Sequence, residues 1–264
     1  SIGKLLVAGM LPGLLLCVSY IAIVIFWVKL KPQAAPASLE PVSWAEKFRS
    51  LLGVWEPLVL FLLVMGGIYG GLFTPTEAGA VGATLLFAVA LIKRSLTWPV
   101  LIGALIESLR ISVMVLFLVA GANVFSYFLA LSTIPVQVAG WAASLDVSPY
   151  LIHTVIIIIY LFLGCFLDAI SMMVLTMPVI YPIIQALGFN PIWFGVIAVL
   201  MMEAGLITPP MGLNIFTVAG VAPDVKVETI FRGVAPFLLA IFFVAFMITV
   251  IPDIAVYLPS LMSR

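Results

Sequence analysis

An interrupted apolar segment constrains the fold of this chain more than any other feature. Apolar residues run from Ile192 to about Ala222, a length that can cross a bilayer as a helix. Two consecutive prolines, Pro209 and Pro210, interrupt the run near its centre and lie between two glycines. Proline has no backbone N–H and clashes with the carbonyl of the preceding turn. The helix must therefore break at membrane depth.

Such a break exposes polar backbone inside hydrocarbon. The carbonyls of Gly205, Leu206 and Ile207 lose their helical partners, and Thr208 and Asn214 add side-chain oxygens. Unpaired backbone persists at this depth only inside protein or beside a polar cavity. Ion-coupled transporters use broken helices to bind cations with freed carbonyls and anions with half-helix N-termini. The alternative is a proline kink that neighbouring helices repair.

The composition restricts the class of protein. The chain has 264 residues, of which 65% are hydrophobic and 8% are charged, and its long continuous apolar runs predict a polytopic helical membrane protein and not a barrel. Zero net charge without a basic tract argues against a nucleic-acid partner. Cys17 and Cys165 lie in apolar runs as small core residues, and His153 is expected to be packed or interfacial. Nothing therefore favours a metalloenzyme or a membrane hydrolase. The first residue, Ser1, indicates a fragment or processed piece of a longer chain.

Polar breaks divide the chain into seven segments. We expect residues 132–149 to form a loop and the last span to run from Pro236 to about Tyr257. Charged and apolar residues alternate at helical spacing over 43–52, which suits a helix in the membrane interface or an ordinary connector. The segments are 1–31, a transmembrane helix; 32–56, a linker and interfacial arm helix; 57–94, a helical hairpin; 95–148, a transmembrane helix with connecting loops; 149–190, a helix pair joined at Asp168; 191–222, the broken transmembrane helix; and 223–264, a final loop and transmembrane helix.

Charge and an internal similarity suggest how these segments are arranged. Lys and Arg gather in 29–49, 93–110 and 226–232, which would place these loops on the cytoplasmic face. The pattern Gly-x-x-Pro-x-Leu-Leu occurs at Gly9–Leu15 and again at Gly233–Leu239, in spans that the expected topology runs in opposite directions. An inverted repeat would leave this trace, although chance in Leu-rich sequence would also explain it.

Three acids lie in apolar surroundings, each at a helix break: Glu77, Asp168 and Glu203. A charge near the bilayer centre costs about 2.5–3.5 kcal/mol on insertion scales, so such residues usually mark an ion or substrate path. Each also has a structural alternative. Glu77 could lie in the first turn of a helix beside a capping threonine, Asp168 could cap the following helix, and Glu203 could pair with a buried polar group.

Two Thr-Pro breaks resemble each other, Thr74-Pro75-Thr76 and Thr208-Pro209-Pro210. A dehydrated sodium ion needs several oxygen ligands, and two apposed breaks could supply them from carbonyls and threonine hydroxyls. A hairpin tip and a broken span in one chain form a stronger signal than either Thr-Pro pair alone.

Together these motifs resemble the large membrane subunit of the tripartite ATP-independent periplasmic (TRAP) transporters. The similarity covers essentially the whole chain, in order, and would correspond to roughly the C-terminal three-fifths of that subunit. The motifs that carry it are Gly66-Gly67-Ile68-Tyr69-Gly70-Gly71-Leu72-Phe73-Thr74-Pro75-Thr76-Glu77-Ala78, Gly164-Cys165-Phe166-Leu167-Asp168, and Glu203-Ala204-Gly205-Leu206-Ile207-Thr208-Pro209-Pro210-Met211-Gly212-Leu213-Asn214.

The resemblance implies an all-α, elevator-type secondary importer of the bacterial inner membrane, with inverted repeats, a re-entrant hairpin and a broken helix. It further implies sodium coupling, no enzymatic activity, a small four-helix membrane subunit, and a periplasmic binding protein that delivers an organic acid such as a C4-dicarboxylate or a sialic acid. The first 31 residues would be the last helix of the first repeat, and the missing N-terminal part of the subunit would complete the site beside membrane lipid.

The resemblance also implies roles for individual residues. A second-repeat Na⁺ site would include Thr74, Pro75, Thr76, Gly205, Ile207, Thr208, Pro209, Gly212 and Asn214, and the substrate or transport path would include Glu77, Asp168, Glu203 and Met211. Two other functions stay open: a sodium/anion elevator transporter without a binding protein, and a membrane scaffold subunit without a transport path.

Overall fold

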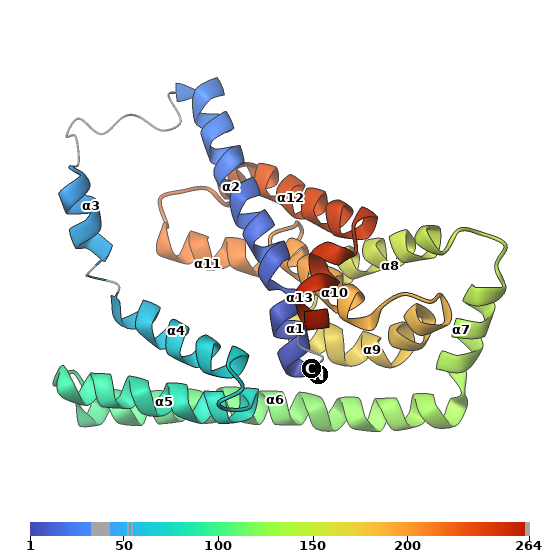
Figure 1. Ribbon diagram of the computed structural model, residues 1–264, viewed down its shortest axis with the longest axis horizontal. Helices are drawn as coiled ribbons and strands as arrows, with labels where there is room; N and C mark the ends of the chain where they lie inside the picture. The colour runs from blue at the N-terminus through green and yellow to red at the C-terminus, as the bar shows by residue number, and fades with distance from the viewer. Residues whose placement is uncertain (33–42, 52, 54, 262–264) are drawn as a thin grey trace. The chain divides into compact units, whose positions relative to one another are not determined.

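The computed structural model describes residues 1–32, 43–51, 53 and 55–261, and within these residues the chain is helical without any β-strand (Figure 1). The linker expected from residue 32 to 41 lies almost wholly outside the described residues. The helices are α1 (Ile2–Ala8), α2 (Met10–Leu30), α3 (Trp44–Leu51), α4 (Trp55–Tyr69), α5 (Pro75–Ile92), α6 (Trp98–Ser132), α7 (Ile134–Ser144), α8 (Pro149–Gly164), α9 (Ala169–Ala186), α10 (Pro191–Leu206), α11 (Leu213–Val221), α12 (Val227–Val250) and α13 (Asp253–Leu261).

Several helices have the length and composition of membrane spans. The outward side chains are apolar as well, with Phe117 80% exposed and Ile92 82% exposed, which suits contact with lipid. Helices α8 and α10 are apolar but shorter. The predicted class, an all-helical polytopic membrane protein, is confirmed. In the described part of the chain, 5 helical segments qualify as spans: Ile2–Leu30, Pro75–Ile92, Trp98–Ser132, Ala169–Ala186 and Val227–Val250.

Two expected loops contain helix instead. The segment 132–149 forms α7, whose buried residues Pro135, Ala139 and Ala142 follow helical spacing and give it one apolar face. This face packs against α9. The last span begins at Val227 and not at Pro236, because Glu228 suits a first helical turn. In both places the helix extends into a segment that we expected to be a loop.

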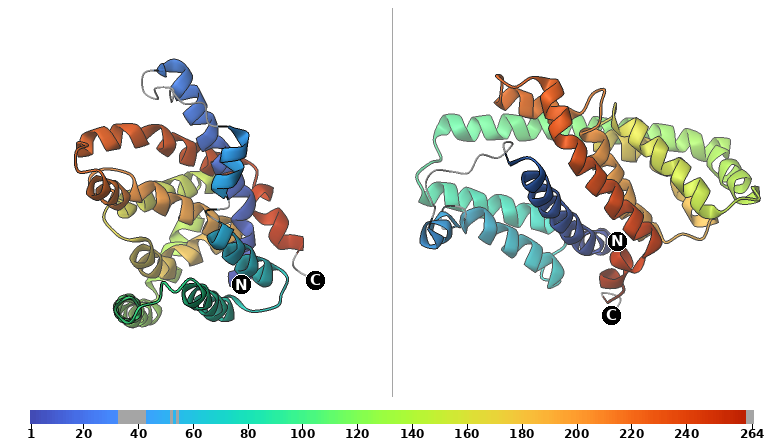
Figure 2. Two further views of the ribbon diagram at one scale, coloured as in Figure 1. Left: turned by 90° about the vertical axis from the view of Figure 1, so that its left-hand side faces the viewer. Right: turned by 90° about the horizontal axis from the view of Figure 1, so that it is seen from above.

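The chain divides into two compact units, of which the first comprises Ser1–Val7 and Trp27–Ile111. Helices α4 and α5 form an antiparallel pair in this unit (Figure 2). Gly67 leaves space for the Phe73 ring, whose nearest atom would lie 2.0 Å from a Cβ at that position. At the far end of the pair, Lys93 Nζ contacts both carboxylate oxygens of Glu56. Close packing at one end and an ion pair at the other hold the two helices together.

Helix α3 also belongs to the first unit and covers most of the segment expected at the membrane interface. Ser43 and Glu46 form a capping box, in which the Ser43 N–H donates to Glu46 Oε2 over 2.8 Å. Trp44 and Phe48, one turn apart, are 74% and 65% exposed. This apolar face is typical of an interfacial helix, and that role stays a prediction.

The second unit comprises Ala8–Phe26 and Ser112–Arg264 and is organised around α10. Apart from Glu203, helix α10 contains only apolar residues, and such a helix is mostly buried. It contacts α8, α9, α12 and α13, which surround it in Figure 1. Trp193, in its first turn, donates an indole hydrogen bond to the Ile248 carbonyl of α12 over 2.8 Å. His153 is fully buried beside Trp193, so the expectation of a packed histidine is confirmed.

Helices α8 and α10 touch backbone to backbone where Gly164 meets Gly205. A Cβ atom on Gly205 would lie 2.5 Å from both the Cα and the carbonyl carbon of Gly164, a distance that real Cβ contacts do not reach. A Cβ atom on Gly164 would lie 3.1 Å from Gly205 Cα. Only glycine therefore permits this approach, which joins the end of α8 to the last turn of α10.

We expect Gly205→Ala to destabilise the protein, because the added methyl group forces the two backbones apart at a cost of about 1–3 kcal/mol. The matched control is Gly220→Ala in α11, where nothing lies within 4 Å of the added Cβ. That variant should be neutral or slightly stabilising, because alanine favours helix over glycine by about 1 kcal/mol. Thermal unfolding of the detergent-solubilised protein measures both, and equal shifts in Tm would contradict the proposed contact.

Candidate functional site

The predicted break lies between α10 and α11. Helix α10 ends at Leu206 and α11 begins at Leu213, after Gly212 with φ of 56°. Because Pro209 and Pro210 have no N–H, the carbonyls of Leu206 and Ile207 receive no backbone hydrogen bond from the described residues. Two acceptors are thus free at the end of a buried helix.

The Gly205 carbonyl behaves differently from the sequence expectation. It loses its regular helical donor, but the last turn tightens and the Thr208 N–H donates to it over 3.1 Å. The contribution of Gly205 to the break is therefore its close packing against Gly164. Tightening of a final helical turn is a common way to satisfy terminal carbonyls.

Thr208 brings a hydroxyl group to the break. Its Oγ1 donates to the Ala204 carbonyl over 2.6 Å, and this bond fixes the direction of the hydroxyl while its lone pairs stay available to a cation. The hydroxyl thus adds an oriented acceptor next to the two free carbonyls.

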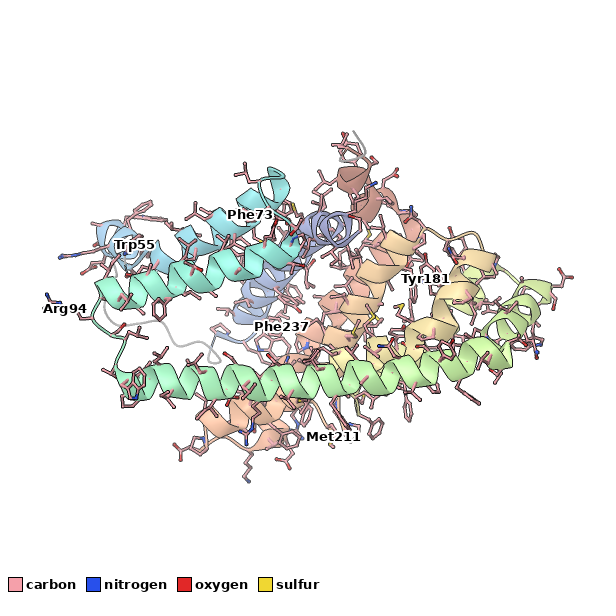
Figure 3. All side chains as sticks on the ribbon, turned by 90° about the horizontal axis from the view of Figure 1, so that it is seen from below. Trp55, Phe73, Arg94, Tyr181, Met211 and Phe237 are labelled. Atoms are coloured by element: carbon pink, nitrogen blue, oxygen red, sulfur yellow. The ribbon has the colours of Figure 1, made fainter. Side chains whose placement is uncertain are left out.

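Part of the loop beyond Thr208 is more exposed, although Gly212 is buried. Pro209, Pro210 and Asn214 are exposed, and Met211, labelled in Figure 3, is 51% exposed. These residues therefore line an open side of the break.

The second part of the site is the turn between α8 and α9, at residues 165–168. Asp168 caps α9: its Oδ1 accepts from the N–H groups of Ile170 and Ser171, each over 3.0 Å, and its Oδ2 accepts from the Ser171 hydroxyl. Asp168 thus adopts the capping role that the sequence left open as an alternative. The Gly164–Gly205 contact brings this hairpin turn against the break.

Glu203 lies one turn before the break on an exposed face of α10. In the described part of the chain its carboxylate forms no ion pair with Lys or Arg, so the expected buried partner of Glu203 is not found there. Tyr20 of α2 packs edge-on against Phe237 of α12, with ring centroids 5.2 Å apart, and Figure 3 labels this phenylalanine.

The other predicted half-site lies in the first unit and is described separately. Thr74 caps α5, with Pro75 in the first turn and Thr76 after it. The Thr74 N–H and hydroxyl both donate to Glu77 Oε2, over 2.7 and 2.9 Å, and the Glu77 N–H donates back to Thr74 Oγ1 over 3.3 Å. This is a complete capping box, so the structural alternative for Glu77 is present.

The structure thus brings together one part of the predicted site. Gly205, Ile207, Thr208 and the Asp168 turn belong to one unit, and the Thr74–Glu77 segment belongs to the other. Sequence reasoning assigned no role to Gly164, although the residue lies in a motif that it singled out. A single glycine at the end of an otherwise bulky apolar helix was the available signal.

Comparison with known proteins identifies the family of this chain. The fold defines a multi-pass helical membrane protein. A family described as "Tripartite ATP-independent periplasmic transporter, DctM component" matches residues 1–254, and the chain belongs to this family, whose members are inner-membrane proteins.

Curated relatives support this assignment. The C4-dicarboxylate TRAP transporter large permease protein DctM of Pseudomonas aeruginosa is 35% identical over 98% of the chain, and the sialic acid TRAP transporter large permease protein SiaM of Vibrio cholerae is 33% identical over 99%. The 2,3-diketo-L-gulonate large permease protein YiaN of Escherichia coli is 33% identical over 97%. The chain spans 60% of the length of each of these three relatives.

We expect Asp168→Ala to lower stability by about 1 kcal/mol, because two N-terminal amides of α9 lose their acceptor. Asp168→Asn should keep the cap, since asparagine is an equally good N-cap residue. Thermal unfolding of both variants distinguishes capping from charge. A similar loss of Tm in the two variants would show that the carboxylate, and not the cap, stabilises this turn.

Proposed function

We propose that this chain is part of the large permease subunit of a TRAP transporter that imports an organic acid together with sodium. The observation that carries the proposal is the α10 break, packed against the end of α8, where the carbonyls of Leu206 and Ile207 lack backbone hydrogen bonds next to the Thr208 hydroxyl. Carbonyl and hydroxyl oxygens are the ligands that a dehydrated sodium ion requires. The protein performs no covalent chemistry.

The cation binds at the break in this proposal. Ile207, Thr208 and neighbouring backbone of the hairpin turn supply its oxygen ligands, while Pro209 and Gly212 shape the loop. For Thr74, Pro75 and Thr76, which lie in the first unit, we likewise propose a role as cation ligands. Asn214, beside the N-terminus of α11, and Met211 face the substrate, whose carboxylate benefits from the positive end of that helix.

The acids contribute indirectly. Glu77 and Asp168 hold the two tips in shape through their caps, and Glu203 presents a charge along the transport path. For Glu77 and Asp168 this division agrees with their hydrogen bonding.

The substrate is a small organic acid. The relatives named above are described as transporters of C4-dicarboxylates, sialic acid and 2,3-diketo-L-gulonate, so the same kind of site serves different acids. Recognition through helix N-termini and backbone fits this range, because it reads the carboxylate and little else. A periplasmic binding protein then delivers the substrate and contributes to selectivity.

Assembly completes the transporter. A small four-helix membrane subunit and the N-terminal part of the large subunit surround the described helices, together with lipid, and the two repeats are inverted copies. Transport follows an elevator motion in which the second unit carries the site. Support comes from the repeated Gly-x-x-Pro-x-Leu-Leu pattern in α2 and α12, whose Tyr20 and Phe237 are in contact.

The test is uptake into proteoliposomes that contain the full large subunit and its small partner, supplied with substrate-loaded binding protein. Thr208→Val should reduce sodium-driven uptake about tenfold or more, because it removes a cation ligand. Thr208→Ser retains the hydroxyl and should transport normally. Uptake is measured with and without an inward sodium gradient, for succinate, a sialic acid and 2,3-diketo-L-gulonate.

A matched control is Thr249→Val in α12, which removes a hydroxyl with the same internal bond, to the Ala245 carbonyl over 2.8 Å, away from the break. This variant should retain full uptake. Wild-type uptake without sodium, or full activity of Thr208→Val, would sink the cation assignment and leave the break as a structural kink.

A further inference from the structure

A hydroxyl pair formed by buried Tyr160 and half-buried Thr176 links the two arms of the α8–α9 hairpin and has no part in the proposed site. Tyr160 of α8 is 1% exposed, and its hydroxyl lies 2.7 Å from Thr176 Oγ1 of α9. Thr176 Oγ1 already donates its hydrogen to the Met172 carbonyl over 2.8 Å. Tyr160 must therefore donate and Thr176 accept. We call this contact the Tyr160–Thr176 bridge.

The bridge lies close to the turn that meets the break. Tyr160 precedes Gly164 by one helical turn, so both residues occupy the same face of α8, and Gly164 touches Gly205. The Tyr160 ring also packs edge-on against Phe194 of α10, with centroids 5.9 Å apart. The tyrosine thus contacts both the second hairpin arm and the helix that carries the break.

The second arm depends on contacts of this kind. Helix α9 contains Pro178 and Pro182, each of which removes one internal hydrogen bond, so α9 is held less firmly by its own backbone than a regular helix. Thr176 lies in the turn before these prolines. A hydrogen bond from the neighbouring arm fixes α9 at that level. The bond is favoured because a buried tyrosine hydroxyl without a partner would be energetically costly.

We propose that the Tyr160–Thr176 bridge positions the hairpin turn at the distance from the α10 break at which the site binds sodium. This inference rests on the proposed sodium-coupled function. Neither residue touches the ion or the substrate, and both act through the Gly164–Gly205 contact. Loss of the bridge therefore weakens sodium binding specifically and leaves recognition of the loaded binding protein unchanged.

Sodium titration of uptake tests this inference in the complete transporter. Tyr160→Phe should raise the sodium concentration for half-maximal uptake about fivefold, the usual equilibrium effect of one neutral hydrogen bond. The KM for loaded binding protein at saturating sodium should not change. Thr176→Ser keeps the acceptor and should behave as wild type. Tyr181→Phe is the matched control, because that hydroxyl, on the 41% exposed residue labelled in Figure 3, bonds only Gln185 of its own helix.

We expect these variants to fold, so a change in their sodium requirement can be interpreted. Tyr160→Phe leaves Thr176 bonded to Met172, so no buried group loses its last partner. The double variant Tyr160→Phe/Thr176→Val removes both hydroxyls and is the second test. Its sodium requirement should match that of Tyr160→Phe alone, because both lack the same bridge. An additive effect of the two changes would contradict a shared role.

Cys165 offers a readout of sodium binding without transport. This thiol lies in the hairpin turn and is 7% exposed, so alkylation requires the turn to move. With all other cysteines replaced by serine, sodium should slow maleimide labelling of Cys165, and Tyr160→Phe should require about fivefold more sodium for the same protection. If sodium alters neither uptake nor labelling in the wild type, the sodium-coupled function fails and this inference fails with it. A normal wild-type response with no shift in Tyr160→Phe would overturn the bridge alone.

Discussion

A polypeptide in hydrocarbon must form all its backbone hydrogen bonds internally. The two prolines after α10 supply no N–H group, so the last carbonyls of this helix cannot all be bonded within it. The structure answers this constraint in two ways. The last turn tightens so that the Gly205 carbonyl recovers a donor. Neighbouring helices bury α10 as far as Gly205, and Leu206 and Ile207, whose carbonyls do not recover a donor, are half-buried. The apolar composition of α10, interrupted by Glu203, fits this need, because a helix that ends in unbonded carbonyls requires neighbouring helices around it. The candidate site is thus a short stretch of backbone that lacks its helical hydrogen bonds and that neighbouring helices partly shield.

The acids in the apolar segments show how local chemistry and function overlap. Glu77 and Asp168 both lie at helix N-termini and both accept amide hydrogen bonds there, as does Asn190 at the start of α10. Short polar side chains at these positions satisfy N–H groups that lipid cannot. An acid in a membrane segment therefore indicates a helix start as readily as an ion path. Only Glu203, in the interior of α10, falls outside this explanation.

Part of this architecture was predictable from sequence because it depends on covalent properties of the chain. Proline fixes the position of the α10 break, and the helix pair joined at Asp168 follows from apolar runs separated by a capping residue. The helix α7 lies where a loop was expected, and the helical spacing of Pro135, Ala139 and Ala142 becomes meaningful only once their packing against α9 is known. The contact of Gly164 with Gly205 was not predictable, since local sequence does not say which glycines face each other. The same holds for the Tyr160–Thr176 bridge, whose partners are separated by the hairpin turn.

The enclosure of α10 has a mechanical consequence. Its buried side chains pack between those of α8, α9, α12 and α13. Protein interiors are close-packed, so these helices could slide past one another only by opening voids. A displacement of the break relative to the hairpin would have to separate two glycine backbones and expose a core that contains Trp193, Phe194 and Met201. These helices therefore form one rigid body, held by the packing around α10. If the proposed function holds, an ion bound at the break keeps the ligands that α10 and the hairpin turn supply whenever this body moves as a whole.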